Sequence, residues 1–107
     1  MLGISRAKRQ LDFNGINSAA LSALPSLLAR WLPGGRRSGH EYLARNPKRA
    51  DRAPGSFAVN LVTGKWADFA TDDRGGDPIS LAAYLFDLSQ GEAARRLAEM
   101  LGIQETL

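Results

Sequence analysis

Six cations within a short stretch of this 107-residue sequence could bind phosphate groups. Residues 36–52 hold these six cations against Glu41 and Asp51, so the stretch carries +4 while the rest of the chain sums to −1. The cations are Arg36, Arg37, Arg45, Lys48, Arg49 and Arg52. Several cations on one surface supply most of the affinity for nucleic acid. The stretch therefore predicts a nucleic-acid interface, and a solvated loop is the alternative.

Two aromatic residues near these cations could stack the bases of a single strand. Tyr42 lies inside the basic stretch, and Trp66 directly follows Lys65. A binding site for single-stranded nucleic acid needs exposed aromatic or guanidinium planes, on which bases stack, as well as cations. The predicted interface therefore consists of the six cations together with Tyr42, Lys65 and Trp66.

The orientation of Trp66 decides whether its ring can reach a base. If Phe69 faces the core, alternation of side chains puts Trp66 on the opposite face of the sheet, across the hairpin from Asn60. There the ring could stack a base. It could equally be covered by an N-terminal helix through Leu28 or Trp31, because the chain has few large apolar residues.

Metal and catalytic chemistry find little support in the sequence. The chain has no cysteine, and its one histidine, His40, has neither an acid nor a nucleophile at a recognisable spacing. Four acidic residues lie close together, namely Asp68, Asp72, Asp73 and Asp77. Their spacing matches no calcium loop, and turns and a helix cap explain them. We expect no metal, no cofactor and no catalytic site.

The first regular element expected is an amphipathic helix. Asn17 or Ser18 can cap it, and Pro33 with two following glycines ends it. The apolar positions are Leu21, Leu24, Leu27, Leu28, Trp31 and Leu32. Pro25 either kinks this helix or marks a new start near Leu24.

A small antiparallel sheet should follow. Residues 41–44 predict a short strand, after which the basic stretch continues as a long loop. Apolar alternation over residues 57–61, a turn at 62–65 and a return over 66–69 predict a hairpin. The next residues, TDDRGGD, predict a loop. The sheet is expected to have three or four strands.

Two helices are expected at the C-terminal end. Asp77 as N-cap and Pro78 at the first helical position predict a helix to about Phe86. Ser89 and Glu92 form a capping-box pattern that opens a second helix, which Gly102 should end. The predicted fold class is α+β, with one N-terminal helix, a small sheet and two C-terminal helices.

The chain is expected to form one domain with a basic N-terminal arm. We assign residues 1–16 to a flexible arm and residues 17–107 to the domain. The composition, with 44% hydrophobic and 23% charged residues, is ordinary for a soluble globular protein. No apolar run approaches the roughly 20 residues that a membrane helix needs, and residues 1–9 lack the apolar block of a secretory signal. A cytoplasmic location is therefore expected.

Four segments carry a resemblance to a known family: GSFAVNL, GKWADFA, GGDPISLAAYL and EAARRLAEMLGI. Together they resemble the N-terminal zinc-ribbon domain of bacterial DNA primases, especially the form in primase-helicases of phages and plasmids. The resemblance covers residues 46–103. In that family two cysteine-containing knuckles hold zinc. Here they fall near NPKRAD and FATDD, and neither keeps a ligand of the expected kind.

The resemblance implies a zinc-ribbon-like domain without zinc that contacts single-stranded template DNA. A structural zinc contributes on the order of 10 kcal/mol in isolated zinc fingers, so other interactions must replace it. Leucines of the N-terminal helix packing on the sheet are the expected main source. Exposed ion pairs between the basic stretch and Asp72 or Asp73 would add only about 0–1 kcal/mol each.

The function expected from these features is an accessory module in phage or plasmid DNA replication that binds single-stranded DNA. Two alternatives remain open. The domain could dock on a separate primase or helicase without touching DNA, or it could be the N-terminal targeting portion of a longer primase-helicase.

Overall fold

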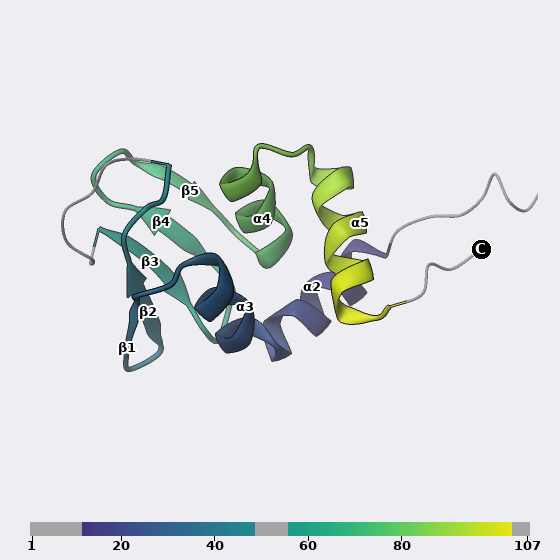
Figure 1. Ribbon diagram of the computed structural model, residues 1–107, viewed down its shortest axis with the longest axis horizontal. Helices are drawn as coiled ribbons and strands as arrows, with labels where there is room; N and C mark the ends of the chain where they lie inside the picture. The colour runs from purple at the N-terminus through teal and green to yellow at the C-terminus, as the bar shows by residue number, and fades with distance from the viewer. Residues whose placement is uncertain (1–11, 49–55, 104–107) are drawn as a thin grey trace, which may run out of the picture.

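The computed structural model describes residues 12–48 and 56–103 (Figure 1). These residues form four helices and one five-stranded antiparallel sheet, which confirms the predicted α+β class. The elements are α2 (Phe13–Ser22), α3 (Leu24–Trp31), β1 (Arg36–Ser38), β2 (Glu41–Ala44), β3 (Phe57–Asn60), β4 (Trp66–Asp68), β5 (Asp73–Gly75), α4 (Pro78–Phe86) and α5 (Gln90–Leu101). The strands pair in chain order from β1 to β5. Figure 1 shows the sheet at one end of the molecule and α2 and α5 at the other.

The N-terminal helical segment begins earlier than predicted. Helix α2 starts at Phe13, and the Asp12 carboxylate caps it by accepting a hydrogen bond from the backbone N–H of Gly15 at 3.0 Å. Ile16 on this helix is buried. The expected boundary at residue 17 is therefore too late, because the first turn of α2 already belongs to the folded domain. Residues 1–11 of the predicted arm lie outside the described residues.

A second helix replaces the single one that was expected. Helix α3 begins at Leu24 with Pro25 in its first turn, so the new start is the correct interpretation of this proline. Asn17 does not cap its own helix. Its side-chain oxygen instead accepts a hydrogen bond from the backbone N–H of Ile79 at 2.9 Å, which ties α2 to the first turn of α4.

The three central strands follow the prediction, and the two edge strands do not. Strand β2 occupies residues 41–44 as expected, and β3 and β4 form the predicted hairpin, with Gly64 in its turn at a φ of 81°. Strand β1 was given no predicted element, and the segment of β5 was predicted as loop. Both are three residues long and lie at the edges of the sheet, where charged residues are common.

The C-terminal helices start and end as their capping residues predict. The Asp77 carboxylate accepts from the backbone N–H of Ser80 at 2.8 Å, and Ser80 completes a capping box at α4. Ser89 caps α5 through the N–H of Glu92 at 3.1 Å. Gly102 ends α5 in the left-handed conformation.

The buried side chains form two clusters. One lies among the helices and comprises Ile16, Ala20, Leu27, Ile79, Ala82, Ala83, Ala93, Ala94, Leu97 and Ala98. The other joins α3 and α4 to the sheet and comprises Leu24, Leu28, Leu32, Ala44, Phe57, Val59, Trp66, Leu81 and Leu85. The predicted packing of N-terminal leucines on the sheet is thus confirmed. No helix in the described part of the chain is long and apolar enough to cross a membrane.

Candidate nucleic-acid interface

The helices cover one face of the sheet. Residues that pair directly across antiparallel strands have their side chains on the same face. On the helix-covered face, Tyr42 pairs with Val59 and Val59 pairs with Trp66. Val59 and Trp66 belong to the cluster that includes leucines of α3 and α4. We refer to the opposite side as the open face.

A row of five paired residues crosses the open face from one edge strand to the other. The row consists of Arg36, Leu43, Ala58, Ala67 and Arg74. An arginine therefore lies at each end, with smaller or apolar residues between them. Both arginines are exposed. Cations at two edges of a shallow apolar surface suit a strand whose phosphates pass the edges and whose bases lie in the middle.

The neighbouring row adds polar side chains to the open face. Glu41 pairs with Asn60, and the Asn60 side chain donates to a Glu41 carboxylate oxygen at 3.2 Å. Lys65 lies opposite Asn60, since the Asn60 N–H donates to the Lys65 carbonyl at 2.7 Å. These three residues, with Ala58, Trp66, Ala67 and Phe69, line a groove of about 190 Å³, which we call the sheet groove.

Phe69 supplies the aromatic surface that the sequence interpretation assigned to Trp66. Its side chain is 74% exposed and borders the sheet groove. An exposed ring beside a groove can stack a base of any identity. Neither Phe69 nor Arg74 was in the predicted interface. Phe69 entered the sequence analysis only as a possible core residue, and Arg74 lies in a segment that was predicted as loop.

Trp66 is buried and cannot stack a base. It is 5% exposed, its indole N–H donates to the Ser80 hydroxyl at 2.9 Å, and its ring centroid lies 4.7 Å from that of Tyr84. The predicted pairing with Asn60 is wrong, because Trp66 pairs with Val59. That pairing depended on Phe69 facing the core, whereas the Phe69 side chain is 74% exposed. The alternative of burial is correct.

Tyr42 and Arg37 also face away from the open face. The Tyr42 hydroxyl donates to the backbone carbonyl of Leu32 at 2.8 Å, and the ring packs so closely on Gly35 that a methyl group there would lie 2.5 Å from it. Arg37 pairs with Tyr42 and therefore shares its side of the sheet. Tyr42 holds the end of α3 against the sheet and is not available for stacking.

The remaining predicted cations do not join one surface. Arg45 is exposed just after β2. Lys48 forms an ion pair with Asp87 at the end of α4, and its ammonium lies 5.2 Å from the Tyr84 ring centroid. Arg49 and Arg52 lie outside the described residues. Of the described cations, the strand register places Arg36 and Lys65 on the open face and Arg37 on the other side, and Lys48 pairs with Asp87, so the described part of the basic stretch does not form one continuous surface.

Hydrogen bonds connect the two segments in which the resemblance implies metal ligands. The Asn46 side-chain amide donates to a carboxylate oxygen of Asp68 and to the Tyr84 hydroxyl, both at 2.8 Å. The Tyr84 hydroxyl donates to the Asp73 carboxylate at 2.7 Å. The other Asp68 oxygen accepts from the N–H of Ala70 at 2.9 Å. Asn46 and Asp68 are fully buried, and this polar network joins the end of β2 to β4, β5 and α4.

The polar network does not suit zinc, which prefers four thiolate or imidazole ligands in structural sites. Among the described residues, no group of three or more histidines, cysteines and acids could hold a metal ion.

Burial raises the pKa of Tyr84, and its hydrogen bond to Asp73 raises it further, because both disfavour the phenolate.

The expected ion pairs between the basic stretch and Asp72 or Asp73 are not formed by its described residues. Asp72 instead lies 3.6 Å from the Arg74 guanidinium, and Asp73 accepts from Tyr84. Asp72 has a φ of 71°, typical of a turn position that an aspartate tolerates. The acidic residues of this segment thus have local structural roles.

Comparison with known proteins finds no family model that matches this sequence and no curated protein with significant similarity to it. The resemblance to primase zinc ribbons therefore remains a prediction.

Proposed function

We propose that this chain binds single-stranded DNA on the open face of its sheet, as an accessory module in phage or plasmid replication. The observation that carries the proposal is the row from Arg36 to Arg74, whose members Ala58 and Ala67 line the sheet groove together with the exposed Phe69. The replication context rests on the resemblance alone. The site differs from the one predicted from sequence, but the chemistry is the same.

The size and shape of the open face favour a single strand. The sheet groove, at about 190 Å³, is shallow and has alanines in its floor, so a flat base can approach the backbone of the sheet. Stacking on Phe69 requires a base whose face is free, which a duplex does not offer. Many proteins that bind duplex DNA insert a helix into the major groove, whereas stacking on a sheet surface requires no such helix.

The charges on the open face are available to phosphates. Lys65 and Arg36 form no ion pair with another described residue. Arg74 contacts Asp72 at 3.6 Å, but both side chains are more than two-thirds exposed, so this pair is weak and can yield to a phosphate. Binding should therefore weaken steeply as salt rises.

Fluorescence anisotropy with a labelled oligothymidine of about 20 nucleotides tests the proposal. Replacing Phe69 by Ala should weaken binding by about fivefold to 150-fold, since stacking contributes about 1–3 kcal/mol per base. The matched control is Phe86→Ala, because Phe86 is also exposed but lies on the helical side of the molecule. This control should leave the affinity unchanged.

Two results would count against single-strand binding on the open face. One is equal affinity of the Phe69→Ala variant and the unmodified protein. The other is tighter binding of a duplex of the same length. Absence of any binding at low salt would leave docking on a primase or helicase as the better candidate function.

A further inference from the structure

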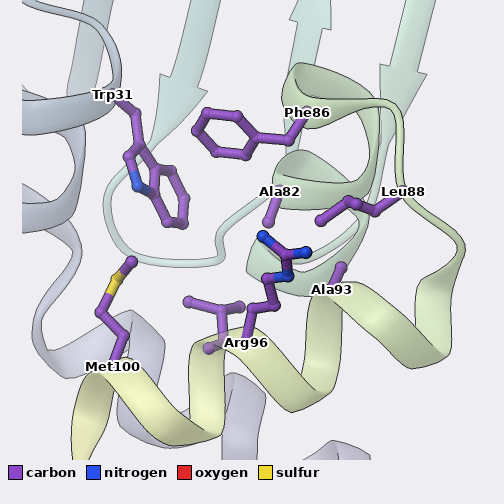
Figure 2. Close-up of a pocket in the computed structure, with 8 residues that line it drawn as sticks. Trp31, Ala82, Phe86, Leu88, Ala93, Arg96 and Met100 are labelled. Carbon is purple, nitrogen blue, oxygen red and sulfur yellow. The ribbon is translucent and has the colours of Figure 1, made fainter.

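A second surface, on the helical side of the molecule, has the composition of a protein-docking site. Helices α3, α4 and α5 meet without closing and leave a groove of about 400 Å³, which we call the helical groove. It is lined by Trp31, Ala82, Phe86, Leu88, Ala93, Arg96, Leu97 and Met100 (Figure 2). None of these residues belongs to the proposed DNA-binding face.

The floor of the helical groove consists of small or buried residues. Ala82, Ala93 and Leu97 are buried there. The walls are large and apolar: the Trp31 and Phe86 rings meet edge to face with their centroids 5.7 Å apart. A volume near the lower end of the roughly 300–1,000 Å³ of ligand pockets suits one or two apolar side chains.

Two apolar residues that line the helical groove are also exposed at its rim. Phe86 is 50% exposed and Met100 is 45% exposed. Aromatic and methionine side chains are enriched at protein interfaces, and methionine adapts its shape to a partner. A small ligand held in the groove would leave these rim residues in water, whereas a helix laid along the groove would cover them.

The charge of the groove selects the kind of helix. Among the residues that line it, Arg96 alone is charged, and Figure 2 shows its side chain rising from α5 between Trp31, Phe86 and Leu88. Its Nε donates to Glu92 at 3.0 Å, and Glu92 also pairs with Arg95. These two arginines hold the pKa of Glu92 below its usual value, with Arg96 the main cause.

Glu92 accepts from only one nitrogen of Arg96, the Nε, and it is shared with Arg95. No described residue accepts a hydrogen bond from the terminal nitrogens of Arg96. A carboxylate of a partner could accept hydrogen bonds from these terminal nitrogens, because a guanidinium binds carboxylates through paired donors. We propose that the helical groove docks an acidic amphipathic helix of a partner protein, with its apolar side chains in the groove and a carboxylate on Arg96.

Docking at this site does not depend on the proposed DNA binding. The helical groove and the open face lie on different sides of the domain, so one chain could hold a protein and a nucleic-acid strand together. Loss of one activity would leave the other intact.

Two synthetic amphipathic helices of about 15 residues test the proposal. Both present leucines at positions i, i+4 and i+7, and one carries glutamates beside this stripe where the other carries lysines. Titrations followed by two-dimensional NMR should shift the indole N–H signal of Trp31, with the buried Trp66 as an internal reference. The acidic peptide should bind about fivefold more tightly, the effect of one exposed ion pair.

Two variants separate the role of Arg96 from the general positive charge of the chain. Arg96→Gln should abolish the preference for the acidic peptide. Arg95→Gln, which removes the same charge one residue away and outside the groove lining, should retain it. Both side chains are exposed, so neither variant should unfold.

Three outcomes would overturn the proposal. Equal affinity for the two peptides would refute the charge selection, and signal shifts away from Trp31 would refute the location. Self-association in analytical ultracentrifugation that Met100→Glu abolishes would show that a second copy of the chain occupies the helical groove.

Discussion

The buried amide of Asn46 should be one of the most costly polar groups to remove. Its Nδ2 donates to Asp68 and Tyr84, and its Oδ1 accepts from the backbone N–H of Lys48, each at 2.8 Å. The side chain is completely buried, so water cannot replace these partners without entering the core. Replacing Asn46 by Ala removes all three hydrogen bonds.

The expected loss follows from the kinds of partner involved. A hydrogen bond to a charged group such as Asp68 contributes about 1.5–3 kcal/mol, and each of the two neutral ones about 0.5–1.5 kcal/mol. Asn46→Ala should therefore lower the free energy of unfolding by about 2.5–6 kcal/mol. A domain of this size is typically stable by only about 5–15 kcal/mol, so much of the stability would be lost.

Urea unfolding followed by far-UV circular dichroism at neutral pH measures this loss. Asn60→Ala is the matched control, since Asn60 also makes three side-chain hydrogen bonds, to Val62, Thr63 and Glu41, but is only half-buried. Water can replace those bonds, so the control should cost about 1 kcal/mol. If Asn46→Ala costs no more than the control, the polar network does not stabilise the fold as we infer.

Three further predictions concern stability. The raised pKa of Tyr84 means that the folded state holds the phenol proton more tightly than the unfolded state does. The stability that this difference contributes is complete below about pH 10 and is lost as the pH rises through the folded-state pKa. The decline in unfolding free energy at alkaline pH should therefore be shallower in Tyr84→Phe. Gly75→Ala would put a methyl group 2.5 Å from the Trp66 indole nitrogen and should cost about 1–3 kcal/mol in urea unfolding, whereas Gly76→Ala, with no atom in reach, should be nearly neutral. Leu28→Ala should cost about 2–5 kcal/mol in the same assay, and a loss under 1 kcal/mol would contradict the view that α3 stabilises the sheet.

The helices of the C-terminal half could be predicted because their signals are local. Asp77 and Ser89 cap the residues that directly follow them, and their hydrogen bonds do not depend on distant parts of the chain. The hairpin of β3 and β4 was predictable for the same reason, since its turn contains a glycine.

Elements and contacts that depend on distant residues were missed. Strand β1 has little strand propensity in Arg36, Arg37 and Ser38 and forms by pairing with β2. Asn17 looked like a cap of its own helix but binds the N–H of Ile79, 62 positions away. Tertiary packing decided both cases.

The sequence left Trp66 open between an exposed and a buried position. The exposed alternative depended on Phe69 facing the core, whereas in the structure Trp66 is buried and Phe69 is exposed. Arg74 could not be assigned because β5 is too short to show a side-chain period. The expected chemistry, cations beside an exposed aromatic ring, stays a prediction, and which residues could supply it depends on the strand register.

The most direct test of the proposed interface compares two adjacent arginines of β1. Arg36 lies on the open face, and Arg37 shares the side of Tyr42. Affinity for labelled oligothymidine at about 50 mM salt should fall about fivefold in Arg36→Ala. The slope of log affinity against log salt concentration should also become shallower by about one, because one fewer counterion is released. Arg37→Ala should bind as the unmodified protein does. Equal losses in the two variants, or a larger loss for Arg37→Ala, would contradict binding on the open face.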